Sequence, residues 1–102
     1  MSTIRYLTPA ILELERAVDH YELVSPRIAK AFLDEYFRVL DQLRAFPKSA
    51  PVLSLPVRKM VLPKYPYSIL YYIKDEHIVI VSVMAQKQHP DQWKARVNKR
   101  EA

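Results

Sequence analysis

The sequence of 102 residues contains no cysteine and no glycine. Without cysteine the chain can form neither disulfides nor thiolate metal sites, and it has no cysteine nucleophile. Loops that cradle phosphate groups depend on glycine, because only glycine lets the backbone approach the ligand closely, so P-loop and dinucleotide-binding folds are excluded. The eight prolines therefore mark many of the points where helices and strands begin or end.

Long apolar runs are missing as well. No run approaches the roughly 18 residues that a membrane span needs, and the N-terminus lacks the apolar core of a signal peptide. We therefore expect a cytoplasmic protein with no membrane partner. Because half of the residues are hydrophobic and the length suits one compact core, we expect a single domain over residues 1–102.

Positive charge is unevenly distributed along the chain. Residues 1–47 contain six Lys and Arg against seven Asp and Glu, a net charge of −1, whereas residues 48–102 contain ten against four, a net charge of +6. A basic half favours an acidic partner, either a nucleic acid or an acidic polypeptide. The alternative is that the basic surface only keeps a small protein soluble.

The N-terminal half predicts a short strand, residues 4–7, followed by two helices. Thr8 and Ser25 each stand before a proline, which is typical of an N-cap at the start of a helix. Pro47 prevents the second helix from continuing much beyond Ala45. The expected apolar stripe of the first helix is Ile11, Leu14, Val18 and Tyr21, and the expected inner face of the second helix is Ala29, Phe32, Tyr36, Leu40 and Leu43.

The second helix carries more apolar surface than one stripe requires. Leu33, Phe37 and Val39 lie off its inner face. Either this helix is buried on two sides, or it offers an apolar groove to a partner.

The second half predicts three strands, at residues 57–62, 67–73 and 77–84. The last two are rich in β-branched and aromatic residues and flank a short polar break, which indicates a β-hairpin. Residues 48–56 form a connection with little regular structure. We expect an α+β fold, in which the N-terminal two-helix hairpin packs on one face of a three- to four-stranded, mainly antiparallel sheet.

Tyrosines gather around the predicted strand 67–73, at positions 65, 67, 71 and 72. Interleaved with Arg58, Lys59 and Lys64, they are one possible stacking platform for single-stranded nucleic acid. Strand alternation makes both faces of this strand largely apolar, which favours packing against the helices on one face and partial cover by a partner on the other.

Catalytic and metal-binding motifs are scarce. His20, His77 and His89 lack the spacing of metal ligands, and no serine has the flanking glycines of a nucleophile elbow. Neighbouring carboxylates, such as Glu13 and Glu15, are expected to lie on solvated helix faces. We therefore expect neither a metal ion nor a cofactor.

The order and spacing of these features resemble the RelE/ParE superfamily of bacterial toxins, the toxic partners in type II toxin–antitoxin pairs. The family outline is a strand, a two-helix hairpin and three strands that carry R…L…[FY]PY.I.Y, followed by a closing segment of the type H-Q-R-R-x-P-x-[YW]. The resemblance covers nearly the whole chain. The residues that carry it are Arg58, Leu62, Tyr65, Pro66, Tyr67, Ile69, Tyr71 and the closing segment QKQHPDQW from Gln86 to Trp93.

The RelE-like branch of the superfamily cleaves messenger RNA in the ribosome. The resemblance places Ser68 where that branch has its first catalytic arginine. A serine has no positively charged guanidinium with which to bind a phosphate. The second catalytic arginine falls in the stretch 85–87, where Lys87 is the one cation. An endoribonuclease would therefore need a rebuilt site, with Arg58, Lys87 and His89 as its fallback catalytic residues.

The ParE-like branch inhibits DNA gyrase by binding it. Tyr65-Pro66-Tyr67 and the xPx[YW] ending are closer to this branch, although Met84-Ala85 replaces its usual Ala-His. The resemblance thus implies a binding toxin that a cognate antitoxin neutralises. An mRNA endoribonuclease and a basic nucleic-acid-binding module are the alternatives.

The resemblance and the charge pattern together name two sets of site residues. The expected target-binding residues are Arg58, Lys59, Lys64, Lys87, His89, Trp93, Lys94 and Arg96. The expected antitoxin-binding residues are Leu33, Phe37, Tyr65 and Tyr72. For Trp93 the simpler interpretation is that it pins the C-terminal tail to the sheet.

Overall fold

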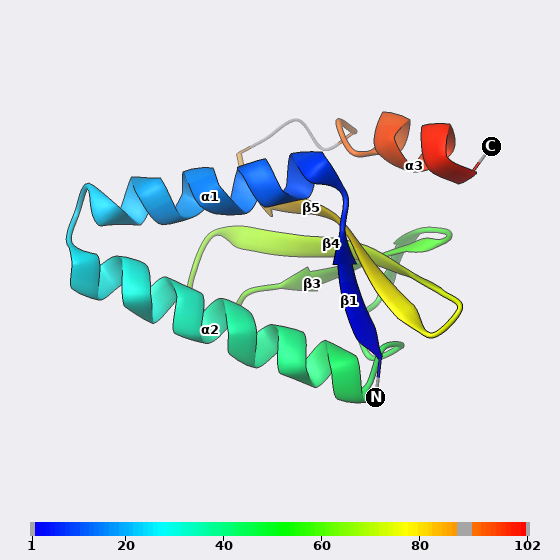
Figure 1. The fold of residues 1–102 in the computed structure, drawn as a ribbon, viewed down its shortest axis with the longest axis horizontal. Helices are drawn as coiled ribbons and strands as arrows, with labels where there is room; N and C mark the ends of the chain where they lie inside the picture. Colours follow the sequence, from blue (N-terminus) through cyan, green and yellow to red (C-terminus); the bar gives the residue numbers. More distant parts are fainter. Residues whose placement is uncertain (1, 88–90, 102) are drawn as a thin grey trace.

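The computed structural model describes residues 2–87 and 91–101. Figure 1 shows α1 and α2 as an antiparallel pair along the sheet, with α3 beside the N-terminal end of α1. The elements are β1 (Thr3–Tyr6), α1 (Thr8–Glu22), α2 (Pro26–Ala45), β2 (Val52–Ser54), β3 (Val57–Val61), β4 (Tyr67–Lys74), β5 (His77–Ala85) and α3 (Lys94–Glu101).

The strands form one sheet in the order β1-β5-β4-β3-β2. β1 pairs in parallel with β5, and the other three pairings are antiparallel. The α+β class and the mainly antiparallel sheet are confirmed, but the sheet has five strands instead of three or four. The additional strand is β2, three exposed residues that lie in the segment 48–56, where we expected little regular structure.

The two helices start differently. At α2 the cap is as predicted, because the Ser25 hydroxyl accepts a hydrogen bond from the Ile28 N–H at 3.1 Å. At α1 the prediction is wrong by one residue: Thr8 is already helical, and Leu7 occupies the N-cap position without a side-chain hydrogen bond. Pro9 still lies in the first turn, where a missing N–H is harmless.

The main core lies between the helix hairpin and the sheet. All five residues predicted for the inner face of α2 are buried. The predicted stripe of α1 is partly wrong, because Ile11 is 42% exposed and the residues of α1 that are buried are Ala10, Glu13 and Ala17. Small alanine side chains let α1 approach β5 closely, and larger residues flank the contact.

The off-face residues of α2 divide between the two alternatives. Val39 is buried and Leu33 packs against the core, so the helix is indeed buried over more than one stripe. Phe37 is 51% exposed, and its ring contacts only the edge of Tyr36 among the described aromatic pairs. The helix therefore keeps one large apolar side chain at the surface.

The second face of the sheet is covered by the chain itself. Leu70 and Tyr72 of β4 belong to a separate buried cluster with Trp93 and Val97. Trp93 immediately precedes α3, and Val97 lies within it. The expected partner on this face is thus replaced by the C-terminal helix. Burial on both faces explains why the sequences of β4 and β5 are almost continuously apolar.

The β4–β5 hairpin turns through two left-handed residues, although the chain has no glycine. Asp75 has a φ of 51° and Glu76 a φ of 67°, and His77 pairs directly with Lys74. Positive φ at both central residues is the geometry of a type I′ turn, which matches the twist of the flanking strands. Glutamate has no special tolerance for this conformation, so the turn holds local strain.

We predict that Glu76→Gly raises the free energy of unfolding by about 0.5–1 kcal/mol, because glycine adopts positive φ without a Cβ clash. This is the net gain, since the greater entropy of glycine in the unfolded chain cancels part of the relief. Urea denaturation measures the change. Glu76→Ala is the matched control, since it removes the same carboxylate but keeps the Cβ. An equal gain in both variants would contradict the backbone explanation.

A second prediction concerns alkaline stability. Burial raises the pKa of the Tyr36 hydroxyl above its usual value, and the Tyr6 hydroxyl, 2.6 Å away, raises it further. As the pH rises, this phenol therefore ionises first in the unfolded chain. The contribution of Tyr36 to the free energy of unfolding is complete below about pH 10 and then falls by about 1.4 kcal/mol per pH unit.

Chemical denaturation between pH 8 and 11 tests this expectation. Above about pH 10 the free energy of unfolding should fall less steeply with pH in Tyr36→Phe than in the parent, by about 1.4 kcal/mol per pH unit. The reason is that the variant has no phenol to ionise at this position. The two proteins should have parallel curves below that pH. Parallel curves over the whole range would show that Tyr36 does not contribute.

Candidate functional site

A basic groove lies at the loop end of the β3–β4 hairpin. It has a volume of about 350 Å³, and β3, the loop 62–66 and the ends of β4 and β5 line it. Three backbone hydrogen bonds hold the loop: Leu62 N to Tyr67 O at 3.0 Å, Tyr67 N to Tyr65 O at 2.8 Å and Gln86 N to Pro66 O at 2.9 Å. Prolines at 63 and 66 restrict the same loop, so the groove is preformed.

The chemistry of the groove is that of an anion-binding site. Lys59 and Lys64 supply two cations, and Ser68 and Gln86 add neutral polar groups. The described lining residues include no carboxylate and no imidazole, the usual general acids and bases. Lys87 follows Gln86 and is exposed, whereas His89 lies outside the described residues.

The pleat of β3 separates two residues that we expected to act together. Arg58 pairs with Tyr71 and Lys59 with Leu70, so they project from opposite faces of the sheet. Arg58 donates from Nη1 to the carbonyl oxygens of Ala50 at 2.8 Å and Lys48 at 3.2 Å. It thereby holds the connection after α2, and it lies away from the groove.

The predicted tyrosine platform does not form as one surface. Tyr71 and Tyr72 are buried on opposite faces of the sheet. Tyr65 and Tyr67 contact Phe32 and Tyr21, with ring centroids 5.0–6.1 Å apart within this set. Burial raises the pKa of the Tyr67 hydroxyl above its usual range, so this wall of the groove is neutral at physiological pH.

The four predicted antitoxin-binding residues lie in three places. Leu33 and Phe37 lie on α2, Tyr65 is half-buried at the groove, and Tyr72 is only 5% exposed in the cluster with Trp93. The first three are reachable by a partner that spans α2 and the groove. Tyr72 lies on the other face of the sheet, apart from these three.

The C-terminal residues of the target-binding set also divide. Trp93 is buried in the second cluster, which confirms that it pins the tail to the sheet. Lys94 is exposed and forms an ion pair with Asp91 at 3.1 Å. Arg96 is largely buried and serves a structural ion pair, so only Lys94 of these three offers its charge to solvent.

Glu13, which we expected on a solvated face, is the acidic partner of Arg96. Its side chain is 8% exposed and that of Arg96 19%. Glu13 Oε1 accepts from Arg96 Nη1 at 2.9 Å, and Oε2 accepts from Nη2 at 3.1 Å. The Ser82 hydroxyl and the Val83 N–H also donate to Oε1, at 2.9 and 3.2 Å.

One signal in the sequence marks this buried carboxylate. Glu13 stands between Ala10 and Ala17 at the helical spacing i, i+3 and i+7, on the face whose small residues permit close approach. An apolar stripe that is assigned from the large side chains alone misses Glu13, because the large apolar residues of this helix lie on either side of that face.

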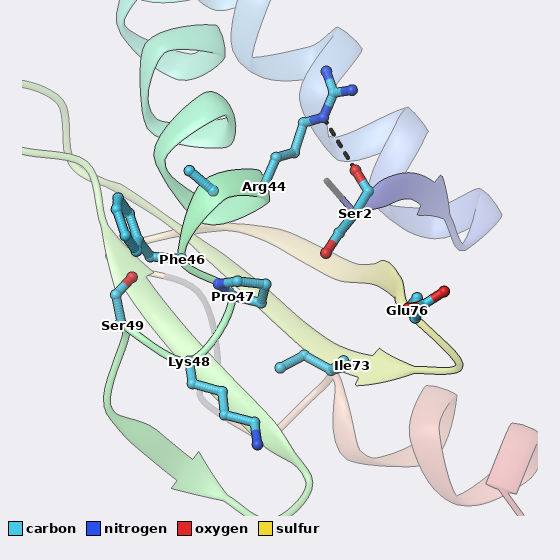
Figure 2. A pocket seen from close by; sticks show the side chains of 9 residues that line it. Ser2, Arg44, Phe46, Pro47, Lys48, Ser49, Ile73 and Glu76 are labelled. Carbon is cyan, nitrogen blue, oxygen red and sulfur yellow. Dashed lines mark hydrogen bonds between the residues drawn. The ribbon is translucent and has the colours of Figure 1, made fainter.

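A wide hollow lies where α2 ends, with a volume of about 850 Å³. Figure 2 shows that the basic side chains along it, Arg44 and Lys48, point apart. Arg44 Nε donates to the Ser2 carbonyl oxygen at 3.2 Å. Ligand sites need a few convergent polar groups, so this hollow does not qualify.

The described residues contain neither a metal-binding cluster nor a helix that could span a membrane. Within the described residues no group of three or more His, Asp or Glu side chains is arranged to hold a metal ion. None of the described helices combines the length and apolar character that crossing a bilayer requires.

The sequence matches a protein-family model described as the ParE toxin of the type II toxin–antitoxin system parDE, over residues 4–90. Among solved structures, the chain is similar to one from the chromosomal ParDE TA system of P. aeruginosa, with 21% identity, coverage of 83% of this chain and 96% of that chain, and a TM-score of 0.64. It is also similar to the isolated E. coli RelE toxin, with 14% identity, 100% coverage of both chains and a TM-score of 0.61. No curated protein sequence matches significantly. The solved structures confirm the expected RelE/ParE-like fold.

For the buried ion pair we predict that Glu13→Gln lowers the free energy of unfolding by about 2–3 kcal/mol, because Arg96 loses its carboxylate while still largely buried. The glutamine oxygen can still accept from Ser82 and Val83, so the loss reports the charge. Adding Arg96→Met should recover most of it, since an apolar pair often replaces a buried ion pair at little cost.

Guanidinium denaturation measures these changes. Glu15→Gln, two residues away and exposed, is the matched control and should stay within about 0.5 kcal/mol of the parent. A Glu13→Gln protein as stable as this control would show that the ion pair contributes nothing.

Proposed function

The chain belongs to the family of ParE toxins of type II toxin–antitoxin systems, and on this premise we propose that it inhibits DNA gyrase by binding the enzyme and that a cognate antitoxin neutralises it. The chain is thus the toxin component of such a system. The gyrase target, the antitoxin contacts and the residues that make them are the parts that we propose.

One observation carries the choice of binding over cleavage. Ser68 stands where the RelE-like branch has its first catalytic arginine, and it is buried beside Met84 in the floor of the groove. Lys59 and Lys64 can hold an anionic group there, but the described lining offers no carboxylate or imidazole, the most common groups for moving a proton. Such a groove suits the recognition of a carboxylate or phosphate on a partner.

The structural role of Arg58 weakens the endoribonuclease alternative further. That alternative requires Arg58 and Lys87 to converge on one phosphate. Arg58 instead projects from the opposite face to Lys59 and is bonded to the backbone of the connection after α2. A rebuilt catalytic site would have to break these bonds.

The surface of α2 supports the antitoxin part of the proposal. Phe37 is half-exposed, and Leu33 lies one helical turn before it. Residues four apart on a helix face the same side, so they offer two adjacent apolar anchors. A partner segment that packs there and reaches Tyr65 would cover the entrance of the basic groove, which explains how one antitoxin could block target binding.

We predict that the purified protein makes gyrase accumulate linear DNA. The assay contains gyrase, ATP and relaxed plasmid, and it is read after detergent and protease treatment. Lys59→Gln combined with Lys64→Gln should raise the required toxin concentration by about tenfold, equivalent to about 1.4 kcal/mol of lost binding. Lys30→Gln, which changes an exposed lysine on α2, is the matched control.

The other outcomes separate the alternatives. Normal supercoiling at saturating, folded protein would reject gyrase as the target. Cleavage of messenger RNA on purified ribosomes would then favour the endoribonuclease. Affinity for nucleic acid that falls steeply with salt, without growth inhibition on expression, would favour a plain binding module.

A further inference from the structure

A second group of basic side chains lies at the opposite end of β4 from the groove. His77 pairs with Lys74 on one side and with Thr3 on the other. Arg5 is two residues beyond Thr3 on β1. Cross-strand partners and alternate residues share a face of a sheet, so Arg5, Lys74 and His77 project from the same face.

These residues line a hollow of about 380 Å³, within the range typical of small-ligand sites. Buried Tyr72 and half-buried or buried residues of β1 and β5 form its walls. Among the described lining residues Asp75 is the single acid, set against the permanent charges of Arg5 and Lys74. The hollow is therefore basic, and three different strands supply its basic groups.

The two residues that flank the hairpin turn lie close together. Lys74 and His77 stand directly opposite each other, so their side chains are neighbours on one face of the sheet. The turn between them forces Asp75 and Glu76 into the left-handed region. Strain of this kind persists where the surrounding structure fixes it and is concentrated at binding sites.

The donors are also well placed for a ligand. His77 Nδ1 is hydrogen-bonded to the Thr3 hydroxyl, which fixes the ring and leaves Nε2 as the nitrogen for a ligand. Arg5 is exposed, and its side chain forms no hydrogen bond or ion pair with the rest of the described chain. Its guanidinium can bind two oxygens of one oxyanion at once.

We propose that Arg5, His77 and Lys74 form a binding site for a phosphate group. Three basic groups around one hollow suit a compact, multiply charged oxyanion better than a single planar carboxylate. The phosphate can belong to a free nucleotide or to the backbone of a nucleic acid, since both present the same oxygens. The site is separate from the groove of Lys59 and Lys64, so this inference does not depend on the gyrase proposal.

NMR and calorimetric titrations test the site with three probes at constant ionic strength: inorganic phosphate, ATP and a short DNA duplex. Inorganic phosphate should shift the ring signals of His77 and the Nε signal of Arg5, and chloride should not. Arg5→Gln combined with His77→Gln should weaken binding by about tenfold or more, the effect of losing charge-assisted hydrogen bonds. Lys30→Gln, which changes an exposed lysine on α2 outside both hollows, is the matched control and should leave phosphate binding unchanged.

The probes distinguish the source of the phosphate. ATP binding without duplex binding assigns the site to free phosphate monoesters, and the reverse assigns it to a nucleic-acid backbone. No shift with any probe, or equal binding by the double variant, overturns the proposal. If the double variant fails to fold, Arg5→Gln alone decides, because this exposed residue can change without disturbing the core.

Discussion

The ion pair between Glu13 and Arg96 joins three elements that the chain does not connect directly. The β1–β5 ladder ends at Ile80, and β5 then bulges, since Tyr71 pairs with Ile80 but Leu70 pairs with Ser82. Beyond this point Arg96 Nη1 donates to the Val81 carbonyl oxygen at 3.0 Å and Glu13 accepts from the Val83 N–H. The two side chains therefore supply hydrogen-bond partners to β5 where strand pairing on that side stops, and buried backbone groups need such partners.

This constraint determines what remains available for binding. Because Arg96 fixes α3, Trp93 and Val97 cover the apolar centre of the second sheet face. Two hollows lined by basic side chains lie at the two ends of β4: the groove with Lys59 and Lys64 at one end, and the hollow with Arg5 and His77 at the other. The surface that we propose for target binding is thus basic and is interrupted by a helix, which suits recognition by charge and shape.

Periodicity was sufficient to predict most of the fold. The inner face of α2 and the β4–β5 hairpin follow from apolar spacing, because burial imposes that spacing. β2 could not be predicted, since its three exposed residues show no alternation. The separation of Arg58 from Lys59 follows from the two-residue period of any strand, but the burial of Glu13 does not, because a carboxylate is buried only when a distant residue such as Arg96 pairs with it. Site prediction thus failed where a side chain's role depends on a partner far away in the sequence.

The absence of glycine connects the fold with the second basic site. A hairpin with a two-residue turn requires positive φ, and most such turns use glycine or asparagine. Here Asp75 and Glu76 take that conformation, and each also contributes a negative charge beside the basic closing pair Lys74 and His77. A glycine would relieve the strain but would remove a charge that offsets this pair. The strained turn therefore keeps Lys74 and His77 opposite each other, at the end of the hairpin where we propose the phosphate site.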